Sequence, residues 1–69
     1  MSKEIGKKIK RILKNRGISY EMLGKRLGMT KQGVSWALNE REDEDWKERD
    51  KEWWAKALKV EVEKINGRG

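Results

Sequence analysis

The chain has 69 residues, of which 43% are charged and 35% are hydrophobic, and its formal net charge is +6. A chain of this length forms one small domain, residues 1–69, and buries a core only if nearly every apolar residue contributes. The absence of Cys and His excludes disulfides and thiolate metal sites, and it removes the most common general base and metal ligand. We therefore predict neither an enzyme nor a metal or other cofactor. Apolar runs are too short to span a membrane and no signal-peptide core is present, which predicts a cytoplasmic protein.

The charge is unevenly distributed along the chain. Residues 1–41 contain eleven Lys or Arg and three Glu, a net charge of +8, whereas residues 42–69 contain seven basic and nine acidic residues, a net charge of −2. A basic half beside a mildly acidic half is typical of a surface that faces a polyanion. Lysines that only solvate a charge-rich protein would give a similar composition, so both interpretations stay open at this level.

Apolar residues at helical spacing predict two helices in the first part of the chain. The first covers residues 2–15, where Ile5, Ile9, Ile12 and Leu13 share one face, and Gly17 is a natural C-terminal stop. Ser19 is a good N-cap for a second helix that ends at Gly28. Its inner face is predicted to contain Tyr20, Leu23, Gly24 and Leu27.

Three further helices are predicted after Gly28. Thr30 caps the third helix, which runs to about Asn39. Residues 40–45 are nearly all charged and have no periodicity, so we expect an acidic, solvated loop there. Asp45, with Glu48 three residues later, resembles a capping box for a fourth helix over residues 46–58. A short fifth helix over residues 60–65 completes the C-terminal part, residues 46–65.

The glycines of residues 19–39 follow a known pattern. Gly24 supplies a small residue in the first helix, Gly28 follows four residues later at the turn, Met29 comes next, and Val34 is a β-branched residue five positions further on. Residues 19–39 thereby resemble the helix-turn-helix of the phage-repressor and Cro-like (XRE-type) family, and the flanking segments resemble its other helices. The resemblance implies a compact all-α, lambda-repressor-like domain of four or five helices. The sequence departs from the family at Gly24, where the family usually has Ala, and at Lys59, where it usually has Gly.

The third helix has polar residues on one side and apolar residues on the other. At about 100° per residue, Lys31, Gln32, Ser35, Trp36 and Asn39 share one arc, opposite an apolar side made by Val34, Ala37 and Leu38. A helix that enters the major groove presents such an arc. Lysine suits guanine O6 and N7, and the glutamine amide suits adenine N6 and N7. The resemblance therefore implies base contacts by Lys31, Gln32, Ser35 and Trp36.

Trp36 is unusual because the family usually has a polar side chain at this position. Three interpretations stay open: contact with a thymine methyl group or sugar, contact with a partner, or burial under the loop that follows. Contacts with the DNA backbone come from cations, hydroxyl groups and helix N-termini. On the family's pattern the predicted phosphate contacts are Ser19, Tyr20, Asn39, Arg41, Lys14 and Arg16.

The fourth helix is rich in tryptophan. Its apolar arc contains Trp46, Trp53, Trp54, Ala57 and Leu58, with Asp50 inside the arc. Packing of these residues into the core is the leading interpretation, because so small a domain needs bulky side chains. Alternatively, part of this end pairs two subunits, as family members often do, so that two half-sites are read. The candidate dimer face is Trp53, Trp54, Val62 and Ile65.

The resemblance implies a sequence-specific regulator of transcription that binds double-stranded DNA. The expected type is a repressor of a phage or mobile element, which acts in the cytoplasm on nucleoid DNA. Whether two copies form a homodimer stays open at this level. The alternative is a protein-interaction module on the same fold, antitoxin-like or coactivator-like, that uses the acidic loop and the Trp-rich helix.

Overall fold

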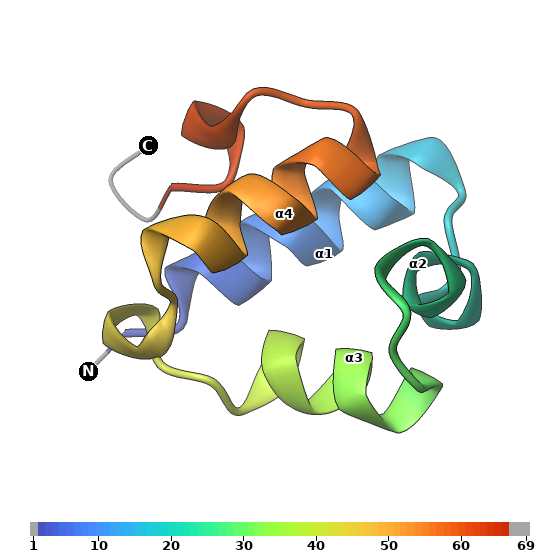
Figure 1. Ribbon diagram of the computed structural model, residues 1–69, viewed down its shortest axis with the longest axis horizontal. Coiled ribbons are helices and arrows are strands. Elements are labelled where there is room, and N and C mark those ends of the chain that lie inside the picture. Colours follow the sequence, from blue (N-terminus) through green and yellow to red (C-terminus); the bar gives the residue numbers. More distant parts are fainter. Residues whose placement is uncertain (1, 67–69) are drawn as a thin grey trace.

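The computed structural model describes residues 2–66, which contain four α-helices and two short 3₁₀ helices and no strand. The prediction of an all-α domain is confirmed. In Figure 1, α2 is seen nearly end-on while α3 lies across the lower edge, so these two consecutive helices cross steeply. The elements in chain order are α1 Glu4–Arg16, α2 Tyr20–Leu27, α3 Lys31–Asn39, η1 Asp43–Asp45, α4 Glu48–Leu58 and η2 Val62–Lys64.

Glycines end the first two helices, as the sequence predicts. Gly17 has φ 64° and Gly28 has φ 74°, which is the left-handed region that glycine adopts without steric cost. The next amide closes each end, since Ile18 N donates to Leu13 O at 2.9 Å and Met29 N donates to Gly24 O at 2.8 Å. The first helix starts at Glu4, two residues later than predicted.

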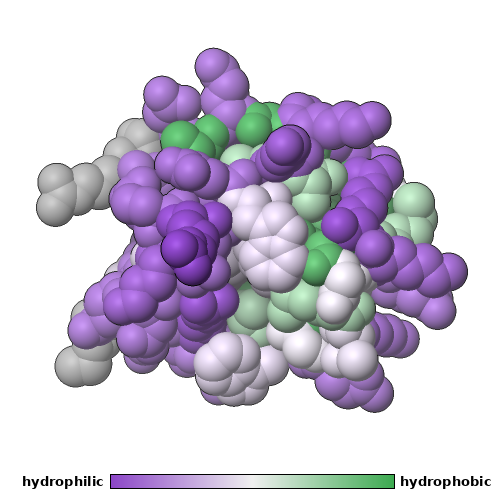
Figure 2. All heavy atoms as spheres, viewed as in Figure 1, coloured by the Kyte–Doolittle hydropathy of each residue, from purple (hydrophilic) through white to green (hydrophobic). Residues whose placement is uncertain are grey.

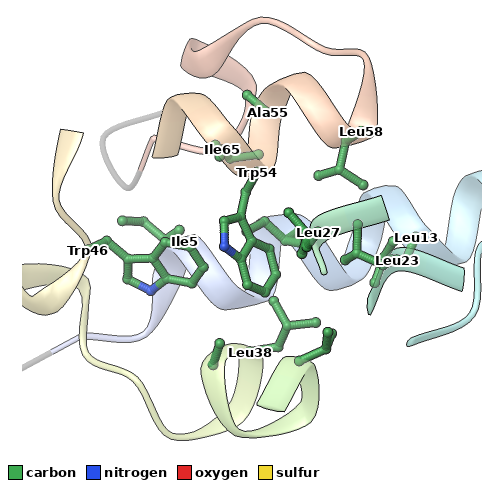
Figure 3. Packing of buried hydrophobic residues seen from close by; sticks show 13 residues of the cluster. Ile5, Leu13, Leu23, Leu27, Leu38, Trp46, Trp54, Ala55, Leu58 and Ile65 are labelled. Carbon is green, nitrogen blue, oxygen red and sulfur yellow. The ribbon is translucent and has the colours of Figure 1, made fainter. Parts of the chain in front are cut away.

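The core gathers side chains from all four helices. Trp54 is 1% exposed and points from α4 towards Leu27 and Leu38 (Figure 3). Its ring meets Trp46 edge to face, with centroids 4.9 Å apart and planes at 80°. Two large indoles thus supply bulk that so short a chain otherwise lacks. The buried apolar residues are Ile5, Ile9, Leu13, Leu23, Leu27, Val34, Ala37, Leu38, Trp46, Trp54, Ala55, Leu58 and Ile65.

Two glycines allow close approach of the backbone to a helix. A Cβ at Gly6 on α1 would overlap the Leu38 carbonyl oxygen at the end of α3. A Cβ at Gly24 on α2 would lie 2.6 Å from the Met29 carbonyl oxygen in the turn. The alanine that the family usually has at Gly24 therefore does not fit here without a backbone shift. Gly6, which the sequence did not single out, fixes how near α3 lies to α1.

The acidic segment is more ordered than a solvated loop. Residues 43–45 form η1, and Asp43 Oδ1 accepts a hydrogen bond from Ile5 N at 2.9 Å, while its Oδ2 accepts one from Ser2 Oγ at 2.8 Å. Asp43 therefore satisfies a free amide in the first turn of α1, a role for which an acidic side chain is well suited. The prediction of an unstructured loop over residues 40–45 is wrong at this residue.

The start of α4 also differs from the prediction. The helix begins at Glu48 rather than Trp46, and the carboxylate that reaches back belongs to Asp50, which accepts from Lys47 N at 3.2 Å. The predicted pairing of Asp45 with Glu48 is therefore shifted by two residues. Asp50 looked out of place in the apolar arc, and this reverse bond explains its position.

The C-terminal segment contains a turn with a strained backbone. Lys59 has φ 59° and ψ 43°, and it is the one non-glycine residue with positive φ among residues 2–66. A left-handed turn of the kind that usually needs Gly is thus made here with Lys, and Val60 N closes it on Ala55 O at 3.0 Å. The predicted fifth helix over residues 60–65 is reduced to one 3₁₀ turn, η2.

Candidate nucleic-acid interface

The first turn of α3 presents two polar side chains to solvent. Thr30 caps the helix, with its Oγ1 accepting from Gly33 N at 3.1 Å, as the sequence predicts. Lys31 and Gln32 follow directly, and both are exposed. Neither forms a hydrogen bond or ion pair with any other described residue, so the ammonium and the amide can both bind an external group.

The inner side of α3 is fixed. Val34, Ala37 and Leu38 are buried, and α3 packs against both α1 and α2. Because these three residues allow only one rotation of the helix, Lys31 and Gln32 must face outward. The two-sided character that the sequence gives this helix is therefore present in the structure.

Trp36 extends the exposed face of α3. Its side chain is 58% exposed, so it is not covered by the segment that follows the helix. This removes burial from the three interpretations of Trp36 and leaves contact with DNA or with a partner. Among residues 2–66, Met22 on α2 and Trp53 on α4 are the other exposed large apolar residues, at 46% and 44%. In the view of Figure 2, near-neutral and apolar residues lie across the middle of the face and hydrophilic residues lie around them.

The last residue of α3 belongs to a small polar network. Asn39 Nδ2 donates to Ser35 O at 2.9 Å and approaches Ser35 Oγ at 3.4 Å, while its Oδ1 accepts from Lys10 Nζ at 2.8 Å. Both ends of the amide are thus engaged, and a phosphate contact by Asn39 would have to replace one of these bonds. Lys10, on α1, lies beside the predicted interface, which the sequence did not reveal.

The N-terminal end of α2 retains its two candidate residues. Ser19 caps the helix, because its Oγ accepts from Met22 N at 3.1 Å, and its hydroxyl hydrogen remains available to an acceptor such as a phosphate oxygen. Tyr20 is half-buried and packs against the core. Both lie at a helix N-terminus, where free amides favour an anion.

Arg41 is held inside the molecule rather than offered to a ligand. Its Nη2 bonds Asp50 Oδ2 at 2.8 Å and Asp45 O at 3.1 Å, and its guanidinium lies 4.7 Å from the centre of the Trp46 ring. The Arg41 side chain is only 21% exposed. The structure therefore gives Arg41 a part in holding the segment before α4, and as a phosphate contact it would have to leave these partners.

Of the two candidates at the end of α1, one is engaged. Arg16 Nη1 donates to Leu58 O at 2.6 Å, which ties the C-terminal end of α1 to that of α4 and satisfies a terminal carbonyl. Arg26, on α2, donates to another carbonyl near the end of α4, with its Nη1 3.3 Å from Ala57 O. Lys14 is exposed, and its side chain has no partner among the described residues. Lys14 is thus the stronger phosphate candidate.

Two of the four residues of the candidate dimer face are buried, and the other two are at least partly exposed. Trp54 and Ile65 are 1% and 0% exposed, so they belong to the core and the expectation that they line a pairing surface is wrong for this fold. Trp53 is exposed and Val62 is half-buried, and these two remain as candidates.

Within residues 2–66, no three acidic side chains are grouped so that they could hold a metal ion. In the same range, no helix combines the length and apolar composition that crossing a bilayer requires. Comparisons of the chain with protein-family models, with curated proteins and with solved structures find no match.

Proposed function

We propose that the protein is a sequence-specific regulator of transcription that binds double-stranded DNA and inserts α3 into the major groove. One observation carries the proposal: Lys31 and Gln32 are exposed and without partners on a helix whose opposite side is fixed in the core. Such a helix presents donors and acceptors to base edges at low entropic cost, since its orientation is already set. The regulator acts as a repressor of phage or mobile-element type by occupying its operator.

Contacts with the DNA phosphates accompany the contacts with base edges. Lys14, Ser19 and Lys31 are exposed at the ends of α1, α2 and α3, and the formal charge of residues 1–41 favours a polyanion. Contacts to phosphates fix the register of a protein on the duplex and carry no sequence information. Ser35 and Trp36 complete the base-reading face, and a second copy that pairs near Trp53 would read a second half-site.

The test begins with selection of bound sequences from a random DNA pool at stated salt. On the preferred site, Gln32→Ala should weaken binding by about 1–3 kcal/mol and relax the preference at one base position. The reason is that a bidentate amide discriminates through geometry. Fluorescence anisotropy on the preferred duplex and on duplexes altered at single positions measures both effects.

Lys14→Ala is the matched control, because it removes an exposed cation away from α3. It should weaken binding to all sequences about equally and lower the slope of log K against log salt by about one unit. The regulator proposal fails if binding is sequence-blind and unchanged by Gln32→Ala. If a protein partner is then retained through residues 40–58, the interaction-module alternative takes its place.

A further inference from the structure

A groove of about 520 Å³ lies between α1 and the segment that joins α4 to η2, away from the polar arc of α3. This volume lies in the range of small-molecule sites in proteins, about 300–1,000 Å³. Its α1 side extends from Lys8 to Arg16, which corresponds to about 12 Å of helix. The lining residues are Lys8, Arg11, Ile12, Asn15, Arg16, Lys59, Val60, Glu61 and Lys64.

The two sides of the groove are tied together at both ends. Lys8 Nζ donates to Asn66 O at 2.8 Å, and Arg16 Nη1 donates to Leu58 O at 2.6 Å. These bonds connect α1 to the chain on either side of η2. These contacts fix the two walls relative to each other, so a ligand would not have to order them.

The lining combines an apolar base with unpaired cations. Ile12 and Val60 are half-buried and pack against the core. Arg11, Lys59 and Lys64 are exposed, and none of their side chains has a hydrogen bond or ion pair with another described residue. Glu61 is the one acidic residue in the lining, against five basic ones, so the groove as a whole favours an anion.

The backbone conformation of Lys59 is a second, independent sign that the groove has a function. Its φ of 59° is a conformation in which glycine is the usual residue, and an L side chain is strained there. Glycine would make the same turn with less strain, yet the chain has a lysine that lines the groove. Strain of this kind is commonly found at functional sites.

We propose that this groove binds an amphiphilic anion, a small molecule that carries a carboxylate or phosphate group on an aliphatic or aromatic body. The anionic group meets the ammonium of Lys59, with Arg11 and Lys64 beside it, and the body covers Ile12 and Val60. A DNA backbone has no apolar group that would cover Ile12 and Val60 at the floor of the groove. An acidic peptide would extend beyond a site whose α1 side is only about 12 Å long. This proposal does not depend on DNA binding by α3.

The test uses three probes on the full chain: 1-naphthyl phosphate, 1-naphthol and inorganic phosphate. Amide chemical shifts followed during titration should place naphthyl phosphate at Arg11, Ile12 and Val60, with a dissociation constant on the order of 0.5 mM for a ligand of this size. Naphthol and phosphate should each bind at least about five times more weakly, because each lacks one half of the recognition. The same ranking with an aliphatic acid and its alcohol would extend the result to non-aromatic bodies.

Lys59→Gly separates binding from folding. It should weaken naphthyl phosphate binding by about three- to ten-fold through loss of a charged contact, and yet raise Tm by about 2–5 °C because the left-handed strain disappears. Lys56→Ala removes an exposed cation of α4 outside the groove and should leave probe affinity unchanged. Both variants should bind DNA as the parent does.

Three results would overturn the proposal. The first is equal affinity for naphthol and naphthyl phosphate, which would indicate adsorption without charge recognition. The second is unchanged probe affinity in Lys59→Gly, or shifts that map to Met22, Trp36 and Trp53 instead. The third is tight binding of an acidic peptide in the groove with none of naphthyl phosphate.

Discussion

Helices α3 and α4 differ in how they use the same kinds of residue. Both pack against α2, and each has one exposed tryptophan. The ends of α4 are tied by side chains from elsewhere: Arg41 bonds Asp50 near its start, and Arg16 and Arg26 bond its last carbonyls. Within residues 2–66, the first turn of α3 has no such bonds, and the side chains of Lys31 and Gln32 have no partner. A polar side chain with an internal partner stabilises the fold, whereas one that is exposed and unpaired is a candidate for binding.

The same difference between bonded and free side chains divides the basic residues of the first part of the chain. The charge of residues 1–41 suggested a broad anion-binding surface, but several of these cations donate within the chain. Lys8 and Arg16 bond carbonyls of the C-terminal segment, Lys10 bonds Asn39, and Arg41 bonds Asp50. The number of basic residues therefore overstates the number of contacts available to DNA.

The largest expected effect comes from Val34 on the inner side of α3. Val34 is 0% exposed, so Val34→Asp would bury an unpaired charge at a cost of at least about 4 kcal/mol. That is comparable to the whole stability of a domain of this size, roughly 3–10 kcal/mol, so the variant should lose its helical circular dichroism. Gln32→Asp puts the same charge on the outer side of α3 and should fold. If Val34→Asp melts like the parent, the rotation assigned to α3 is wrong.

A buried and an exposed tryptophan, Trp54 and Trp36, provide a second test of the difference between the inner and outer sides of the helices. Trp54→Ala should lower the free energy of unfolding by about 3–5 kcal/mol, since it leaves a large cavity among Leu27, Leu38 and Trp46. Trp36→Ala should change it by less than about 0.5 kcal/mol, because the Trp36 side chain is mostly in solvent. Urea titrations give both values. Comparable losses for the two variants would mean that Trp36 is not the exposed residue described above.

Arg41 is a cation with partners inside the protein, whereas the Lys31 side chain has none among the described residues, so the two can be tested against each other. Arg41→Ala removes the bond to Asp50 and the contact with the Trp46 ring, so it should lower stability by about 1–2 kcal/mol. Lys31→Ala should leave stability within about 0.5 kcal/mol of the parent and weaken DNA binding. Thermal unfolding and anisotropy distinguish the two. A stable Arg41→Ala variant with uniformly weaker DNA binding would return Arg41 to the phosphate contacts.

The smallest effect concerns the acidic segment. Asp43→Ala should cost about 1 kcal/mol, within the range measured for lost helix caps, because Ile5 N and Ser2 Oγ lose their acceptor. Its neighbour Glu44 is exposed and has no partner in the described chain, so Glu44→Ala should have no measurable effect. Equal melting of the two variants would show that residues 43–45 are solvated, as the sequence alone suggested.

The sequence by itself determined the first three helices of this protein. Helical periodicity, the stops at Gly17 and Gly28 and the caps at Ser19 and Thr30 are local properties of the chain, and all appear in the structure. The two-sided character of α3 is local as well, because it depends only on the angle between successive residues. The base-contact candidates could therefore be named, although their role stays a proposal.

Only the tertiary structure decided which tryptophans are buried and which cations are engaged. Trp53 and Trp54 are adjacent on one arc, yet one is exposed and the other is in the core, because a helix face is wider than the surface that the other helices cover. Bonds such as Asp43 to Ile5 and Arg16 to Leu58 join residues about 40 positions apart. No local pattern reports on them, since they depend on where the helices pack. The groove beside Lys59 likewise exists only because α1 and the C-terminal segment meet.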